Sequence, residues 1–207
     1  MLAGRGRDAA RTLGVPRAPL RAAERLVAAT ERAVDLGQAT WAGGARYFVN
    51  ALGVGFDAHV AGLAARAGGH GTLAYLRAVG RGLGAYAPAD VTIARDGAPP
   101  AAVSVASVVV ANGPTFGGGM RVAPGADPAD GALDVVVLGA LRRWELALWL
   151  PTLYWGGHLR HPRVATARAR AVTLDGPATL PVQIDGELEG ALPLTIRVCP
   201  GALRLRG

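Results

Sequence analysis

The sequence has little of several features that define other classes of protein. Its 207 residues include a single cysteine, Cys199, so no disulfide can form within the chain, which is typical of a reducing cytoplasm. No stretch reaches the run of about 18 apolar residues that a membrane-spanning helix needs. The first residues, MLAGRGRDAARTLG, lack the apolar segment of a signal peptide, so we expect a cytoplasmic protein.

Lysine is missing, and charged residues make up only 18% of the chain. The 22 basic residues are all arginines, and against 15 acidic residues they give a net charge of +7. These arginines are scattered and are not interleaved with aromatic residues that could stack on bases, so we expect no nucleic-acid partner. Dispersed positive charge favours anionic surfaces in general, including anionic lipid head groups.

Apolar residues are abundant, at 51% of the chain, which is enough for a sizeable core. A helix is expected to begin at residue 19 and to give way to a strand near residues 34–36. Further helices are expected over 57–67, 71–86 and 142–160, and Pro151 interrupts the last of them. Strand signals occupy residues 46–54, 89–97, 103–113, 132–139, 169–176, 180–187, 192–201 and 202–207. Early helices, one late helical insert and about eight strands predict an α+β, mainly β fold built as a β-sandwich.

The stretch QIDGELEG, residues 183–190, places Asp185, Glu187 and Glu189 at every second position. In a strand, this spacing puts all three carboxylates on one face. The pair Asp185-Gly186 is also a strong signal for a two-residue hairpin turn. The stretch alone therefore leaves two interpretations open, a solvated turn with spare carboxylates or a turn that carries a general base.

A second stretch, residues 112–138, reads NGPTFGGGMRVAPGADPADGALDVVVL. The glycines at 117–119 allow close approach of the backbone to a ligand. Asp127 and Asp130 lie three residues apart in a predicted tight turn, a set of oxygen ligands that suits a hard cation such as Mg²⁺. On spacing alone we favour a simpler interpretation, in which the aspartates form an Asx-turn that leads into a hairpin.

Two further motifs are interpreted as structural. GVGFDA, residues 53–58, matches the start of a dinucleotide-binding pattern, but the alternating strands and helices of that fold do not follow it. We interpret it as a tight strand-to-helix turn with Asp57 as the helix N-cap. His158 and His161 lie at the end of a predicted helix, where a solvated loop is favoured over a metal-binding pair.

Several stretches together resemble, in the same order, the C-terminal region of the diacylglycerol-kinase catalytic family, which includes the sphingosine and ceramide kinases. They are ARTLGVP (10–16), VDLG (34–37), YFVNALGVGFDA (47–58), GTLAYLRA (71–78), residues 108–138, GGHLRHP (156–162), VQIDGE (182–187) and VCPGALRL (198–205). The resemblance implies a two-domain lipid kinase, with an N-terminal α/β nucleotide domain followed by a C-terminal β-sandwich. The implied reaction is transfer of the ATP γ-phosphoryl group to a lipid hydroxyl, at a membrane surface.

The resemblance also implies roles for individual residues. Glu187 falls at the position of the family's catalytic base, Asp185 is its neighbour, and Asp8 matches a residue of the motif that joins the two domains. Asp127, Asp130 and Ala132 fall where the family holds Mg²⁺, and Ala132 contributes only its backbone carbonyl. The cofactors implied are therefore Mg²⁺ and ATP.

The chain departs from the family at the domain-joining motif, where GRGRDAAR (4–11) has Arg5 in place of a threonine and Arg7 in place of an asparagine. Because the threonine contacts nucleotide in the family, these changes put ATP binding in doubt. No Gly-Gly-Asp-Gly-Thr loop precedes them. We therefore expect residues 1–36 to be the end of a nucleotide domain that is largely missing, and residues 37–207 to be the sandwich. The chain is then either an incomplete kinase or a stand-alone domain.

The helical insert at 142–160 is rich in aromatic residues, with Trp144, Trp149, Tyr154 and Trp155. Such residues suit contact with a lipid interface, although packing against the sandwich is the simpler interpretation. The insert keeps a second function open, a non-catalytic module that binds lipid or protein through the same sandwich. Either function is compatible with a cytoplasmic protein attached to the inner face of the membrane, and with a homodimer.

Overall fold

The computed structural model describes residues 8–16, 18–28, 30–66 and 72–206. Its elements in chain order are α1 (Asp8–Thr12), α2 (Pro19–Ala28), β1 (Glu31–Trp41), β2 (Gly44–Phe48), β3 (Ala51–Gly55), α3 (Phe56–Arg66), α4 (Thr72–Ala85), β4 (Ala89–Arg95), β5 (Ala101–Ala111), β6 (Leu133–Gly139), α5 (Arg143–Trp149), the 3₁₀ helices η1 (Leu150–Trp155) and η2 (Gly157–Arg160), β7 (Val164–Ala169), β8 (Ala171–Asp175), β9 (Val182–Ile184), β10 (Glu187–Leu188) and β11 (Leu194–Arg206). The mainly β fold predicted from the sequence is confirmed. None of the described helices is long and apolar enough to cross a membrane.

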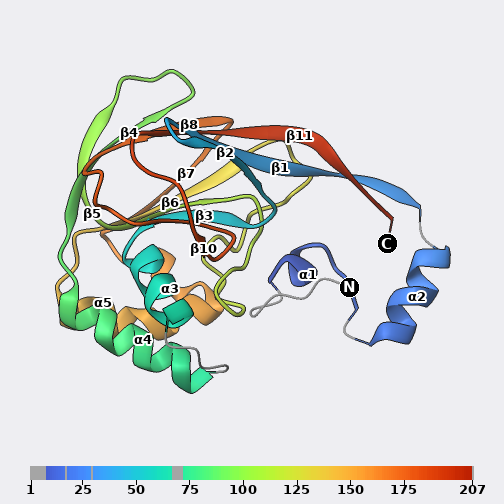
Figure 1. The fold of residues 1–207 in the computed structure, drawn as a ribbon, viewed down its shortest axis with the longest axis horizontal. Coiled ribbons are helices and arrows are strands. Elements are labelled where there is room, and N and C mark those ends of the chain that lie inside the picture. Colours follow the sequence, from blue (N-terminus) through green and yellow to red (C-terminus); the bar gives the residue numbers. More distant parts are fainter. Residues whose placement is uncertain (1–7, 17, 29, 67–71, 207) are drawn as a thin grey trace.

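The described strands form one antiparallel sheet that curls into two layers (Figure 1). Its order is β10-β9-β3-β5-β4-β8-β11-β1-β2, and β6 and β7 continue from β5. Strand β5 makes the change between layers, because its first half pairs with β4 and its second half pairs with β3 and β6. A sheet that bends in this way encloses a core between its layers.

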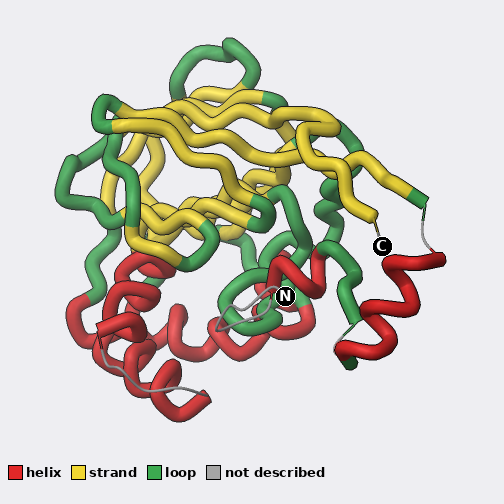
Figure 2. The backbone as a smooth tube through the Cα atoms, turned by 45° about the vertical axis from the view of Figure 1, so that its right-hand side comes forward, coloured by secondary structure: helices red, strands yellow, loops and turns green. Residues whose placement is uncertain are grey.

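The side chains of β5 show how the sequence builds two cores. Val108 and Val110 point into the core between the sheet layers, whereas Val109 and Ala111 point to the other face. That outer face is covered by α3, α4 and α5, which lie together on one side of the sheet in both views (Figures 1 and 2). Because both faces are buried, the strand reads VVVA, an unbroken apolar run, instead of an alternating pattern.

Several predicted boundaries were wrong because long-range pairing outweighed local composition. The helix expected from residue 19 ends at Ala28, and residues 31–41 form β1, which pairs with β11 along nearly its whole length. Strand 46–54 is broken at residues 49 and 50, since β2 pairs with β1 while β3 pairs with β5 and β9. The boundary expected between residues 36 and 37 falls inside β1, and the domain division stays a prediction.

Candidate functional site

The turn that joins β9 to β10 is held to the corner between β2 and β3 by Asp185. One carboxylate oxygen accepts a hydrogen bond from the Val49 N–H at 2.8 Å, and the other accepts from Asn50 at 2.9 Å and Ala51 at 3.1 Å. The Asp185 N–H in turn donates to the Ala51 carbonyl at 2.9 Å. Asp185 has φ 49°, a left-handed conformation that aspartate tolerates better than most residues. Asp185 therefore ties its own turn to the backbone of residues 49–51.

Glu187 points outward from this fixed turn, and its side chain is 70% exposed. The Arg46 guanidinium donates to Glu187 Oε2 at 2.7 Å and also pairs with Glu189. The sequence analysis gave Arg46 no role, and a solvated turn with spare carboxylates was one of its two interpretations of this stretch. Exposed ion pairs contribute only about 0–1 kcal/mol, so the pair between Glu187 and Arg46 can break at little cost.

Asp8 lies against the glycine-rich loop. One of its carboxylate oxygens accepts a hydrogen bond from the Gly118 N–H at 2.7 Å, and the other pairs with Arg11 at 2.6 Å. All three glycines at 117–119 have positive φ, at 61°, 88° and 101°, which is the conformational freedom expected of them. The structure thus brings Asp8 to the loop that the sequence analysis proposed as a ligand cradle. Gly4, Arg5 and Arg7 lie outside the described residues.

A set of polar groups links α1 and the glycine-rich loop to the corner that Asp185 holds. The N–H groups of Asn112 and Gly113 donate to the Asn50 carbonyl at 2.7 and 2.9 Å. A side chain on Gly113 would come within 2.6 Å of Thr12 in α1, so only glycine permits this approach. Among the described residues, the buried atoms Asn50 Oδ1 and Thr12 Oγ1 have no hydrogen-bonding partner. This patch therefore has spare capacity to bind polar groups.

The loop with Asp127 and Asp130 shows the simpler structure that spacing favoured. Asp127 accepts a hydrogen bond from the Ala129 N–H and Asp130 from the Ala132 N–H, each at 3.0 Å. The second oxygen of Asp130 pairs with Arg168. Across the part of the chain that the structure describes, no group of three or more His, Cys, Asp and Glu side chains could hold a metal ion. The Mg²⁺ site at Asp127, Asp130 and Ala132 therefore stays a prediction, in which the two carboxylates are ligands of the kind that Mg²⁺ takes.

Asp35 connects this loop to the rest of the site, and the sequence analysis gave it no role. Its buried carboxylate accepts hydrogen bonds from Gly131 and Gly201, both at 2.7 Å, and its N–H donates to the Pro128 carbonyl. The Asn112 side chain donates to the Asp35 carbonyl at 2.9 Å. The sequence offers one signal for this role, which is a charged residue inside an otherwise apolar strand. A charge buried in this way needs hydrogen-bonding partners.

Asp57 is not the helix N-cap that the sequence predicted. Its side chain turns inward to Ser107 and accepts a hydrogen bond from the Gln183 side-chain amide at 3.2 Å. Burial raises the pKa of Asp57 above its usual value of 3.8, against the opposing effect of hydrogen bonds from Ser107 and Gln183. The Gln183 side chain also accepts a hydrogen bond from the Gly186 N–H at 2.7 Å. Gln183 therefore connects Asp57 to the Asp185-Gly186 turn and helps to hold that turn in place.

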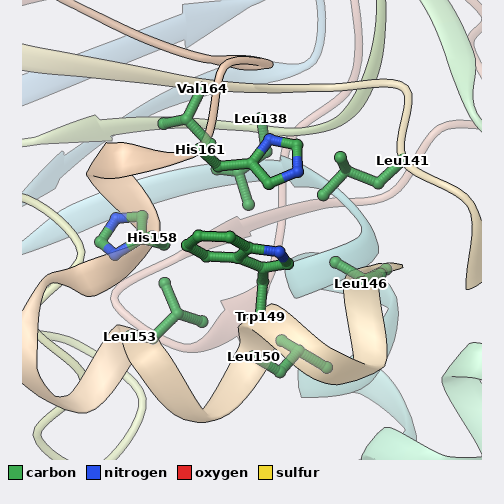
Figure 3. Close-up of a pocket in the computed structure, with 9 residues that line it drawn as sticks. All are labelled: Leu138, Leu141, Leu146, Trp149, Leu150, Leu153, His158, His161 and Val164. Carbon is green, nitrogen blue, oxygen red and sulfur yellow. The ribbon is translucent and has the colours of Figure 1, made fainter. Parts of the chain in front are cut away.

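His158 and His161 are buried, so the predicted solvated loop was wrong. They face a small apolar cavity beneath α5 and η1 (Figure 3). His158 Nε2 lies 3.0 Å from the Val122 carbonyl, and burial lowers the pKa of its imidazole. His161 stacks edge-on against Trp149 at 4.8 Å between ring centroids and accepts from the Arg163 N–H at 3.0 Å. Both rings therefore pack the helical insert against the sheet.

The assembled site can be compared with known proteins. Residues 50–207 match the sequence profile of the YegS C-terminal NAD kinase beta sandwich-like domain. The chain belongs to this family. A diacylglycerol kinase of Mycobacterium tuberculosis, from strains CDC 1551 / Oshkosh and ATCC 25618 / H37Rv, is 31% identical over 206 residues. That match covers 98% of this chain and 66% of the relative, so the chain spans slightly less than two thirds of the curated relatives' length.

Solved structures agree with the fold of this YegS-type domain. The crystal structure of a diacylglycerol kinase from Bacillus anthracis str. Sterne has a TM-score of 0.66 at 19% identity. The match covers 99% of this chain and 64% of the Bacillus anthracis chain. Another chain from the same organism has a TM-score of 0.74 at 22% identity, over 99% of this chain and 66% of its own. The family match includes both the glycine-rich loop and the Asp185 turn, whereas Asp8, Asp35 and Arg46 precede it.

Proposed function

We propose that this chain is the lipid-side domain of a diacylglycerol-type kinase, in which ATP phosphorylates a lipid hydroxyl and Glu187 is the general base. The observation that carries the proposal is the turn at Asp185, which three backbone hydrogen bonds hold to the corner between β2 and β3 and which presents the exposed carboxylate of Glu187. Phosphoryl transfer depends mostly on positioning and charge stabilisation, and this turn supplies positioning for a base. The names of the Mycobacterium tuberculosis relatives support the same reaction.

In this proposal each part of the site has a separate task. Glu187 leaves Arg46 and accepts the proton of the lipid hydroxyl, while Asp185 keeps the turn in place. Asp8 holds the glycine-rich loop through the Gly118 N–H. Mg²⁺ would neutralise phosphate charge, and Asp127, Asp130 and the Ala132 carbonyl would hold it. ATP binding by this chain remains a proposal, without assigned residues.

A second candidate is a non-catalytic module that binds lipid or protein through the same sandwich. The observation that favours it is the pairing of Arg46 with both Glu187 and Glu189. The positive charge of Arg46 stabilises the Glu187 carboxylate as an anion and so makes it a weaker base. Under this alternative, the ion pairs are permanent and serve to fix β10 against β2. The two candidates differ in what happens when one glutamate is replaced.

The test places residues 1–207 in the Mycobacterium tuberculosis diacylglycerol kinase, in exchange for its matching segment, and measures ATP-dependent phosphorylation of diacylglycerol. Glu187→Gln should lower kcat by about 10²–10⁴, the usual contribution of a general base. Glu189→Gln is the matched control, because it removes the other Arg46 partner and leaves the base in place.

Equal losses in the two variants would show that the ion pairs matter and that Glu187 is no base. Full activity of Glu187→Gln would refute the assignment of the base directly. If the chimera folds, binds ATP and fails to phosphorylate lipid even with both glutamates present, the non-catalytic module becomes the better conclusion. The chain expressed alone, assayed in parallel, shows whether residues 1–207 need the added segment.

A further inference from the structure

The helical insert carries a row of exposed apolar side chains. Trp144 is 60% exposed, Leu148 65% and Trp155 65%, and Pro151 between them is also exposed. Trp144 and Leu148 lie four positions apart on one face of α5, and Pro151 and Trp155 continue the exposed apolar surface into the 3₁₀ helix η1. We call residues Trp144, Leu148, Pro151 and Trp155 the apolar ridge. Single exposed apolar residues are common, but a row of this kind points to a contact surface.

The opposite side of the same segment is firmly attached to the sheet. Leu146, Trp149 and Leu153 point into the cavity beneath the insert, where they meet Leu138 of β6 and Val164 of β7 (Figure 3). The imidazole of His161 closes the cavity against Trp149. Packing on this side fixes the rotation of α5 and η1, and the apolar ridge is therefore held outward by the fold.

The charge around the apolar ridge is positive. Arg142 and Arg143 are exposed at its start, and Arg160 is exposed beyond its end. The single acidic residue of 142–160 is Glu145, which is mostly buried and pairs with Arg163 at 3.4 Å. The surface thus combines tryptophan rings with guanidinium groups at both ends. Indole rings favour the boundary between water and lipid, and guanidinium groups pair with phosphate oxygens.

We propose that the apolar ridge is a docking surface for a bilayer that carries anionic lipids. A second copy of the chain is the main competitor for this surface. A two-fold contact along the apolar ridge would bring arginines of one copy against arginines of the other, and like charges at a contact oppose association. An anionic bilayer instead attracts the arginines at both ends.

A series of helix contacts connects the apolar ridge to the strand that carries Glu187. α5 packs on α4, α4 packs on α3, and α3 packs on β9 and β10, where Glu187 lies (Figure 1). Gly62 of α3 approaches the exposed Leu188 so closely that an added Cβ would lie 2.6 Å from its side chain. The docking proposal goes beyond the kinase proposal and does not depend on it, because vesicle binding requires neither ATP nor Glu187.

The experiment measures co-sedimentation of the purified 207-residue chain with phosphatidylcholine vesicles, with and without added phosphatidylglycerol. The variant Trp144→Ala with Trp155→Ala should weaken partition into the anionic vesicles by about tenfold or more, since each ring loses a large apolar contact with lipid. The matched control is Leu20→Ala with Tyr47→Ala, which removes apolar groups that are 72% and 56% exposed elsewhere and leaves the charge unchanged. Brominated phosphatidylcholine in the vesicles should quench tryptophan fluorescence of the wild type and of the control.

Four results would overturn the proposal. They are no binding to anionic vesicles, equal loss in the ridge variant and the control, binding without quenching, and a dimer in light scattering that the ridge variant dissociates. Circular dichroism and the melting temperature of each variant show that it is folded. Glu187→Ala is measured in both assays. If it leaves vesicle binding unchanged and abolishes lipid phosphorylation in the chimera, the docking proposal and the kinase proposal are tested separately.

Discussion

Replacing Asp185 by alanine removes the acceptor of three backbone hydrogen bonds at once. The N–H groups of Val49, Asn50 and Ala51 would lose their partner at the corner where the chain passes from one sheet layer to the other. Alanine would also have to adopt φ 49°, which residues other than Gly, Asn and Asp rarely do. The perturbation therefore has two separable parts, lost hydrogen bonds and backbone strain.

The size of each part follows from where the bonds lie. The bonds to Asn50 and Ala51 are partly buried and charge-assisted, while the bond to Val49 is exposed, and water can replace it. We expect Asp185→Ala to lower the free energy of unfolding by about 3–4 kcal/mol, of which about 1 kcal/mol is left-handed strain. Asp185→Gly should lose about 2–3 kcal/mol, because it removes the bonds without the strain. Asp185→Asn keeps one acceptor oxygen and should lose about 1 kcal/mol.

The assay is urea unfolding of the three variants and the wild type, followed by circular dichroism under identical conditions. The order Asn, Gly, Ala from least to most destabilised is the signature of both parts acting together. A loss below about 1 kcal/mol for Asp185→Ala would refute the reasoning, because the corner would then not depend on this carboxylate. If Asp185→Asn were as destabilising as Asp185→Ala, the stability would come from the negative charge of Asp185 and not from the acceptor oxygen that asparagine keeps.

Other predictions follow from burial and close approach. Burial lowers the pKa of His158 below its ordinary 6.5, so the folded protein favours the neutral imidazole. Relative to His158→Gln, the wild type should therefore lose urea resistance as the pH falls below 6.5, and a difference that does not change with pH would contradict this. Gly53→Ala should destabilise by about 3 kcal/mol or more, because its Cβ would lie 1.6 Å from Asp57 Oδ2, whereas Gly125→Ala has open space and should melt like the wild type. Millimolar Mg²⁺ should raise the melting temperature of the wild type and not of Asp127→Asn, and a rise in both would argue against the proposed ligands.

Local sequence predicted those parts of the site that form within a few residues. The turn at Asp185-Gly186 and the Asx-turns at Asp127 and Asp130 follow from short-range backbone chemistry. The split of RYFVNALGV into two strands could not be predicted in this way. The residues on both sides favour strands equally, and only their different partners, β1 and β5, decide where the chain turns.

The amino-acid sequence by itself determined the family resemblance, the mainly β character and the alternating carboxylates of QIDGELEG. Only the tertiary structure gave those carboxylates different surroundings: Asp185 holds a strand corner, and Glu187 and Glu189 share Arg46, which lies 141 and 143 residues away. It likewise turned Asp57 inward and joined Asp35 to the loop of Asp127. The physical reason is that a turn is fixed by its own dihedral angles, whereas a charged side chain takes its partner from strands that meet only when the sheet has closed.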